Sequence, residues 1–267
     1  MGKIRICVAG ATGWVGRALV PAILKSEDFV LTGAVARRAA GRKICDITGI
    51  PGNETTVTAS LKEALASGAD VLIDYTSPSA VRTNVLKAIE NGVNVVIGTS
   101  GLTDMDYGEI DRSASIKGVG VFAAGNFSIS AALALHFSEI AARYMKSWEI
   151  LDFASENKVD SPSGTALEMA HRLSGAGKPN LEVPVDHTAG YRESRGATIN
   201  GIQVHSIRLP GHVLGVRAEF GSPDERLSIS FDAGAGPEPY IEGTLLAARK
   251  VMQMKGLKRG MDLLLDL

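Results

Sequence analysis

A glycine-rich turn directly after the first apolar run is the feature that most constrains the fold of this chain. Residues 4–9 are apolar and rich in branched side chains, and Gly10, Gly13 and Gly16 follow at the start of a helical pattern. Glycines at this spacing let the backbone approach a pyrophosphate, whose charge meets the free N–H groups of the helix N-terminus. The position after a strand is the context that such a motif requires. The turn therefore predicts a dinucleotide-binding unit. The alternative is a tight strand-to-helix turn that binds nothing.

The residues of this turn are all expected to contact the cofactor. They are Gly10, Ala11, Thr12, Gly13, Trp14, Val15 and Gly16.

Short apolar runs alternate with amphipathic segments through the first half of the chain. Predicted strands occupy residues 4–9, 30–35, 71–75, 93–98 and 119–123. Predicted helices occupy residues 15–25, 61–66, 80–91 and 104–115. Runs that are apolar throughout are typical of buried parallel strands, and their alternation with helices predicts an α/β fold with a Rossmann-type doubly wound parallel sheet.

The pattern changes after about residue 126 and indicates a second, α+β domain. Helices are expected over residues 129–144 and 163–173, strands over residues 148–155, 204–209, 213–220 and 226–233, and a long loop over residues 175–198. A last helix, residues 241–254, is expected to return to the first domain. We therefore predict a dinucleotide-binding domain of residues 1–126 plus 237–267, and a second domain of residues 127–236.

Composition excludes several classes of protein. The formal net charge is −1, which provides no field to recruit nucleic acid or an anionic membrane. No apolar run reaches the ~18 residues of a membrane span, and no signal-peptide pattern is present, so a cytoplasmic protein is expected. The two cysteines, Cys7 and Cys45, have no CxxC spacing, and Cys7 is expected to be a buried apolar residue. The histidines lack the spacing of metal ligands, so no metal is predicted.

The residues after the second strand favour NADPH. An acidic side chain at this place binds the free ribose 2′-hydroxyl of NAD, whereas arginine favours the 2′-phosphate of NADP. Here Arg37 and Arg38 follow the strand and no acid is present. NADPH is therefore the expected cofactor, with NADH as the alternative. The bland interpretation of the two arginines is a solvated basic loop.

Two more loops follow predicted strands, at the edge of the sheet where open α/β sheets bind ligands. Residues 74–78 follow one strand and residues 98–101 the next. Their small and hydroxyl-bearing side chains suit a nicotinamide pocket lined by backbone, although each loop alone could be an ordinary turn. The expected contacts are Thr76, Gly98, Thr99 and Ser100.

The segment of residues 156–166 predicts an anion site. Pro162 and Ser163 precede a helix whose first turn presents Gly164 and Thr165, and N–H groups there can bind a carboxylate. Lys158, just before, adds a cationic donor. The alternative is a capped helix with a nearby surface lysine.

Taken together, these motifs resemble those of the dihydrodipicolinate reductase family. They occur in family order as residues 10–16, 71–76, 96–101, 125–128, 158–166 and 205–211, and the Lys-x-Asp-x-Pro-Ser-Gly-Thr-Ala segment is the most specific of them. The resemblance implies a homotetramer of two-domain subunits, in which residues 127–236 form the substrate-binding and tetramerisation domain. It places the nicotinamide near Gly98–Thr99 and near Asn126 and Phe127, and a cyclic dicarboxylate against Lys158 and the N–H groups of Gly164 and Thr165. We also include Ser155 and Ser163 in the expected substrate site.

The chain departs from the family pattern at several places. The family carries a histidine pair where this chain has Ala154 and Ser155, and an arginine in the glycine loop where it has Trp14. Gly215 stands where another histidine is expected, and Ser230 and Phe231 replace polar or ionisable residues. These changes predict a remodelled substrate pocket, with a less polar imine beside Phe231 as one outcome.

The activity expected from these features is hydride transfer from NAD(P)H to a C=N or C=C bond of a cyclic amino-acid precursor, namely the reductase step of lysine biosynthesis. The cofactor supplies the hydride, and Lys158 is the expected catalytic residue, as proton donor or charge stabiliser. One alternative is an oxidoreductase of the same fold with another imine or amino-acid substrate. Another is an NADP-binding sensor without turnover, which the missing histidine pair would suit and the intact Lys158 cluster would not.

Overall fold

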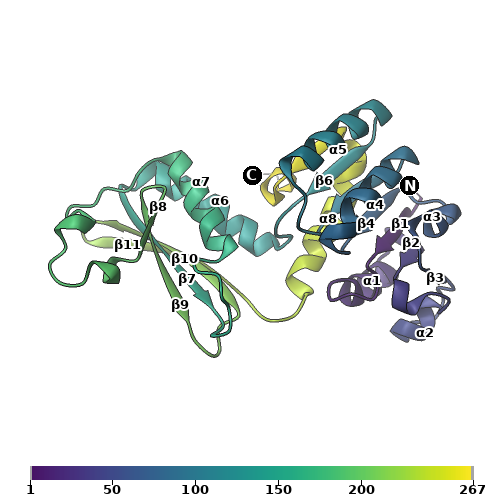
Figure 1. The fold of residues 1–267 in the computed structure, drawn as a ribbon, viewed down its shortest axis with the longest axis horizontal. Coiled ribbons are helices and arrows are strands. Elements are labelled where there is room, and N and C mark those ends of the chain that lie inside the picture. The colour runs from purple at the N-terminus through teal and green to yellow at the C-terminus, as the bar shows by residue number, and fades with distance from the viewer. Residues whose placement is uncertain (1, 266–267) are drawn as a thin grey trace. The chain divides into compact units, whose positions relative to one another are not determined.

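The computed structural model describes residues 2–265, which form two compact units (Figure 1). One unit contains the chain up to Ile129 together with the part from Pro237 onward, and the other contains Ser130–Gly236. Among the described residues, no helix is both long enough and apolar enough to cross a bilayer.

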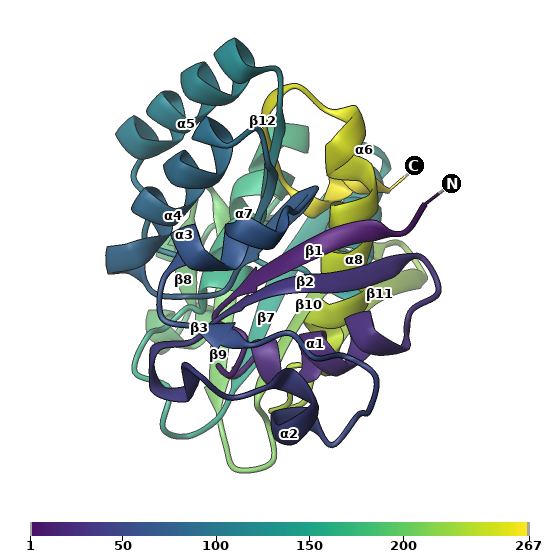
Figure 2. The same cartoon turned by 90° about the vertical axis from the view of Figure 1, so that its right-hand side faces the viewer.

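The first unit is built on a seven-stranded sheet with the order β12-β6-β5-β4-β1-β2-β3, and every pairing in it is parallel. Figure 2 shows β1 beside β2. The strands are β1 (Ile4–Ala9), β2 (Phe29–Val35), β3 (Val57–Thr58), β4 (Val71–Asp74), β5 (Asn94–Ile97), β6 (Gly120–Ala123) and β12 (Gly256–Arg259). Because β1 lies between β4 and β2, the order reverses beside β1, and the carboxyl ends of β1 and β4 form the switch point at which such sheets bind ligands.

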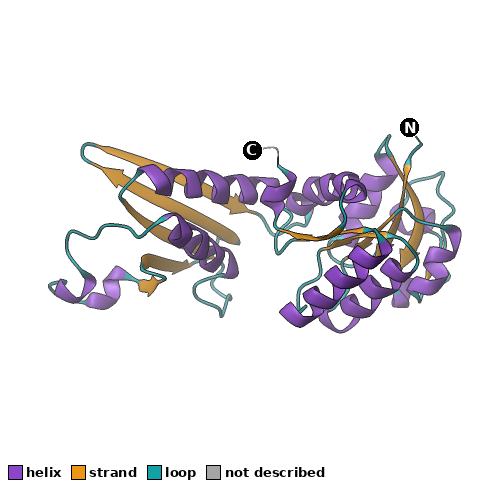
Figure 3. Cartoon of the chain, turned by 90° about the horizontal axis from the view of Figure 1, so that it is seen from above, coloured by secondary structure: helices purple, strands orange, loops and turns teal. Residues whose placement is uncertain are grey.

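Helices lie on both faces of this sheet (Figure 3). They are α1 (Gly16–Lys25), α2 (Ile44–Thr48), α3 (Leu61–Ala64), α4 (Pro78–Glu90), α5 (Asp104–Lys117) and α8 (Ile241–Lys250). The central strands β4 and β6 are buried along their length, as the apolar runs predicted. Cys7 is buried among them, and burial raises the pKa of its thiol to about 12, so the thiol stays protonated. The predicted doubly wound α/β fold is confirmed.

The second unit combines a five-stranded sheet with two helices. The sheet has the order β11-β10-β7-β9-β8, in which only the β7–β9 pair is parallel among the described strands. The strands are β7 (Ser147–Ala154), β8 (Ala197–Ile199), β9 (Ile202–Arg208), β10 (Leu214–Ser222) and β11 (Glu225–Ala233), and the helices are α6 (Ile129–Tyr144) and α7 (Gly164–Ala176). In β7 the buried positions alternate from Trp148 to Ala154, and apolar side chains of both helices share one core with this face.

Several elements differ from the sequence prediction. The expected loop of residues 175–198 contains two 3₁₀ turns, Val185–His187 and Arg192–Arg195, and its end joins β8. The last helix ends at Lys250 and continues as a 3₁₀ turn. We did not predict α2, β3, β8 or β12. They are two to five residues long, too short for a hydrophobic period to emerge.

Candidate functional site

The glycine turn of the first unit is shaped by close backbone contacts. Gly10 has a φ of 86°, and a Cβ at this residue would lie 2.0 Å from the carbonyl oxygen of Tyr75. A Cβ at Gly16 would lie 2.1 Å from the carbonyl oxygen of Gly10, whereas one at Gly13 would lie 3.1 Å from the same oxygen. Two of the three glycines are therefore required by contacts that any larger residue would break, and the third is more tolerant.

The turn leaves a set of N–H groups without partners at the start of α1. The amides of Gly10 and Ala11 donate to the carbonyl of Val35 at 2.9 and 3.1 Å, and that of Gly13 donates to Gly10 at 2.9 Å. Within the described part of the chain, four other amides have no acceptor; they belong to Thr12, Trp14, Val15 and Gly16. Unpaired donors at a helix N-terminus form a site for an anion such as a pyrophosphate, so the residues present fit a dinucleotide.

A buried carboxylate organises the two loops beside this turn. Asp74, at the end of β4, has no exposed surface. Its Oδ1 accepts hydrogen bonds from the N–H of Thr76 at 3.1 Å, from the hydroxyl of Thr76 at 2.7 Å and from the hydroxyl of Thr99 at 2.7 Å. Its Oδ2 accepts from the side-chain amide of Asn84 at 2.8 Å. The carboxylate thereby ties the loop after β4 to the loop after β5.

The ring of Tyr75 lies against two more of the predicted residues, Gly98 and Phe127. It packs edge-to-face on Phe127 at 6.1 Å, and a Cβ at Gly98 would lie 2.1 Å from it, so only glycine fits there. Burial raises the pKa of Tyr75, whose hydroxyl is hydrogen-bonded to Thr244 at 2.7 Å. Asn126 accepts a hydrogen bond from the N–H of Ser128 at 2.8 Å. Through these contacts the loops that follow β1, β4, β5 and β6 meet at one edge of the sheet.

The two arginines that were expected to select the cofactor are exposed. Arg37 and Arg38 lie in a 3₁₀ turn after β2, and neither forms an ion pair within residues 2–265. Trp14 is 57% exposed and packs edge-to-face on Tyr240 at 5.6 Å. A groove of about 940 Å³ runs beside Trp14 along α1, so this side of the glycine turn is open.

In the second unit, the predicted anion site is the N-terminus of α7. Ser163 caps the helix, because its Oγ accepts the N–H of Ala166 at 3.3 Å. Ser163 is 1% exposed, and its own N–H donates to Asp152. The amides of Gly164 and Thr165 have no acceptor in the described structure, and Gly164 is exposed. The helix terminus therefore presents two free donors at the surface.

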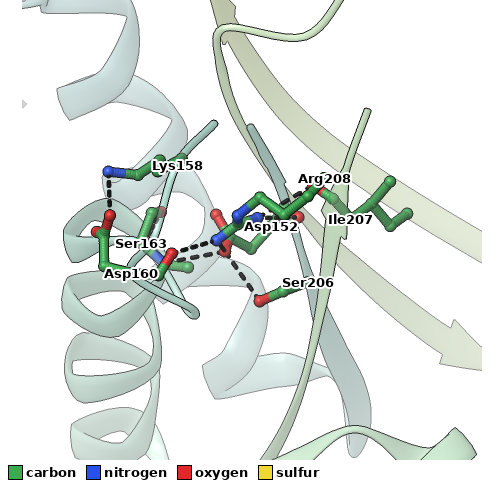
Figure 4. Close-up of polar contacts among 8 residues, drawn as sticks. Asp152, Lys158, Asp160, Ser163, Ser206, Ile207 and Arg208 are labelled. Carbon is green, nitrogen blue, oxygen red and sulfur yellow. Dashed lines mark hydrogen bonds and ion pairs between the residues drawn. The ribbon is translucent and has the colours of Figure 1, made fainter. Parts of the chain in front are cut away.

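The ammonium of Lys158 is held next to this terminus by an ion pair. Its Nζ lies 2.7 Å from Oδ1 of Asp160, and the two side chains are 30% and 52% exposed (Figure 4). The hydrogen bond from Lys158 lowers the pKa of the Asp160 carboxyl. The ammonium that an anion would contact here is therefore already held in place, and Asp160 neutralises part of its charge.

Sequence reasoning missed two buried carboxylates, Asp74 and Asp152. Asp152 accepts hydrogen bonds from Ser163 and Ser206 and an ion pair from Arg208. Their positions in the sequence could have indicated burial. Asp74 ends an apolar strand, and Asp152 takes one of the inward positions in the alternating pattern of β7.

The positions that depart from the family pattern lie mainly inside the second unit. Ala154 is fully buried, and Phe231 is 7% exposed and part of the core of this unit. The ring of Phe231 packs in this core, and the placing of a substrate beside it stays a prediction. Ser155 is partly exposed. A Cβ at Gly215 would lie 2.3 Å from Oδ1 of Asp232, an exposed side chain that can rotate away from it.

Comparison with known proteins decides the family. The model described as dihydrodipicolinate reductase, N-terminus, matches residues 4–127, and the one described as dihydrodipicolinate reductase, C-terminus, matches residues 130–265. The chain belongs to the dihydrodipicolinate reductase family. It is 37% identical to the 4-hydroxy-tetrahydrodipicolinate reductase of Moorella thermoacetica over 98% of each chain. It is 36% identical to the protein of the same name from Desulfitobacterium hafniense over the full length of both.

Solved structures agree with this membership. The dipicolinate-bound dihydrodipicolinate reductase of Paenisporosarcina sp. TG-14 superposes with a TM-score of 0.86 at 27% identity, covering 98% of this chain and all of the other. An amine dehydrogenase from Mycobacterium smegmatis shares the fold alone, with a TM-score of 0.65 at 13% identity.

Family membership confirms the resemblance found in the sequence. The chain is an NAD(P)H-dependent oxidoreductase with a small-molecule substrate. The hypothesis of a sensor without turnover is not favoured. Among residues 2–265, no group of three histidine, cysteine, aspartate or glutamate residues is arranged to hold a metal ion.

Proposed function

We propose that this chain reduces 4-hydroxy-tetrahydrodipicolinate with NADPH, in the diaminopimelate route to lysine. The observation that carries the proposal is that relatives of this name align from end to end at 31–37% identity, so that both the glycine turn and the Lys158 segment lie within the matched lengths. From the family resemblance we also infer a cytoplasmic homotetramer.

The first unit would hold the cofactor by backbone and by charge. The four unpaired amides at the start of α1 would bind the pyrophosphate, and Arg37 and Arg38 would bind the 2′-phosphate that distinguishes NADPH from NADH. Thr76, Thr99 and the backbone near Gly98, Asn126 and Phe127 would hold the nicotinamide, and the Asp74 carboxylate fixes the two threonines. The bound cofactor supplies the hydride.

The second unit would hold the substrate. A ring carboxylate accepts hydrogen bonds from the amides of Gly164 and Thr165 and an ion pair from Lys158, each charge-assisted contact contributing about 1.5–3 kcal/mol. Lys158 leaves Asp160 for the substrate, stabilises negative charge and supplies the proton that completes the reduction. Ser163 is buried and engaged by its neighbours, so its role is to cap the helix, and Ser155 lines the site from the end of β7.

The test is steady-state oxidation of NADPH with enzymatically generated 4-hydroxy-tetrahydrodipicolinate, beside a panel of other cyclic imines. We expect the first substrate to give the highest kcat/KM. The Lys158→Ala variant should lose about 10²–10⁴-fold in turnover and keep its affinity for NADPH. Lys146→Ala, which removes an exposed lysine of the same unit, is the matched control and should behave as wild type. Faster turnover of another imine by the wild-type enzyme would refute the proposed substrate.

A further inference from the structure

A buried ion pair lies beneath the segment that carries the anion site. Arg208, at the end of β9, donates from Nη2 to Oδ2 of Asp152 on β7 at 2.8 Å. The same Nη2 donates to the carbonyl oxygen of Asp160 at 2.8 Å, and Nη1 donates to the carbonyl of Ile207 at 3.0 Å. One guanidinium therefore joins two strands of the sheet to the loop that precedes α7.

The carboxylate of Asp152 holds the other end of that loop. Its Oδ2 accepts the N–H of Ser163 at 2.9 Å and the hydroxyl of Ser206 at 3.0 Å (Figure 4). Residues 160 and 163 are thus both bonded to the ion pair. At the first of these residues, the carboxylate of Asp160 holds the ammonium of Lys158. The second, Ser163, is followed directly by Gly164 and Thr165, whose amides are free.

The energetic cost of this arrangement argues that it does more than stabilise the sheet. Asp152 has no exposed surface, and it lies on the same buried face of β7 as the core residues Trp148 and Ile150. A buried ion pair can often be replaced by apolar residues without loss of stability. Moreover, Oδ1 of Asp152 and Nε of Arg208 are buried without hydrogen-bond partners, so the ion pair leaves one acceptor and one donor unpaired.

We infer that Asp152 and Arg208 are positioning residues that orient Lys158 and the amides of Gly164 and Thr165 toward the anionic substrate. This assignment rests on the proposed function. Asp152 is fully buried and cannot contact the substrate itself, so it acts through the 160–163 loop, to which it and Arg208 are bonded at both ends.

The experiment measures binding and catalysis separately in Arg208→Lys. A lysine keeps the charge but cannot reach Asp152 and the Asp160 carbonyl with one planar group. We expect KM, and the Kd of dipicolinate measured by calorimetry, to rise about 10- to 100-fold, because small misplacements of binding groups are costly. The Kd of NADPH should be unchanged. The double variant Asp152→Leu with Arg208→Met should keep a thermal midpoint near wild type but still bind dipicolinate weakly.

Arg172→Met is the matched control. Arg172 is a largely buried arginine of the same unit, ion-paired with Glu139 at 3.0 Å, and both residues lie on helices outside the loop. We expect this variant to lower the thermal midpoint and leave the KM and the Kd of dipicolinate unchanged. Wild-type constants in Arg208→Lys, or an equal loss in Arg172→Met, would overturn the positioning role alone. Failure of the wild-type enzyme to bind dipicolinate or to turn over the proposed substrate would overturn the proposed function and this assignment with it.

Discussion

Replacing Asp74 with asparagine tests whether one buried carboxylate organises the cofactor side of the first unit. The substitution keeps the size of the side chain and removes its charge. In the wild-type protein, four hydrogen bonds converge on this carboxylate, from Thr76 twice, from Thr99 and from Asn84, at 2.7–3.1 Å. The asparagine oxygen can keep the threonine contacts, and the amide of Asn84 can turn to face the new N–H₂ group.

The magnitude follows from the loss of charge. A hydrogen bond to a charged group contributes about 1.5–3 kcal/mol, and one between neutral groups about 0.5–1.5 kcal/mol. Each of the four bonds therefore weakens by roughly 1 kcal/mol, and some relaxation reduces the sum, so we expect about 2–4 kcal/mol of destabilisation. For a protein of this size this corresponds to a decrease in Tm of roughly 4–16 °C.

The assay is thermal unfolding together with titration of NADPH. We expect Asp74→Asn to lower the Tm by this amount and to weaken the binding of NADPH, since a neutral oxygen holds Thr76 and Thr99 less firmly than a carboxylate does. Asp104→Asn removes a carboxylate that is 97% exposed and is the control; it should change stability by no more than about 0.5 kcal/mol. Unchanged Tm and NADPH affinity in Asp74→Asn would refute the role of this carboxylate.

Four further predictions follow from the geometry. Gly16→Ala should raise the Kd of NADPH by more than about tenfold, and Gly13→Ala by less, because their new Cβ atoms would lie 2.1 and 3.1 Å from the same carbonyl oxygen. Equal increases in a binding titration would contradict this. Arg37→Asp should raise the Kd of NADPH and not that of NADH. If the wild-type enzyme bound NADH more tightly than NADPH, the proposed preference would be excluded. Ala154→His should destabilise the enzyme by about 1–3 kcal/mol and leave kcat/KM no higher, because this position is fully buried; a gain in kcat/KM would show that the site lacks its imidazole. For Asp152, burial acts to raise the pKa but is outweighed by hydrogen bonds from its neighbours, so the folded-state pKa lies below the unfolded value of about 3.9. The stabilisation that the Asp152 carboxylate provides should be complete above about pH 5 and lost as the pH falls through the folded-state pKa. The free energies of unfolding of wild type and Asp152→Asn, measured in urea, should therefore converge in acid. A constant difference between them down to low pH would contradict the shift.

The sequence by itself determined the architecture of the first unit and the kind of chemistry. Apolar runs long enough to fill a strand must be buried, and the glycine turn after the first of them admits few backbone paths. The helix of residues 129–144 was predicted with its observed bounds, because its apolar period extends over four turns. Lys158, Gly164 and Thr165 could be proposed from sequence because a cation and a helix start lie within eight residues of each other.

Only the tertiary structure decided which groups act together. Asp74 and Thr99 are far apart in sequence, as are Asp152 and Arg208, and parallel neighbours in a sheet are set by crossover connections that no local pattern records. The same holds for burial: Ser163, expected to contact the substrate, and Phe231, expected beside it, are both buried. Local sequence fixes backbone conformation over a few residues, whereas a side chain's exposure and its long-range partners depend on segments that reach it only when the chain has folded.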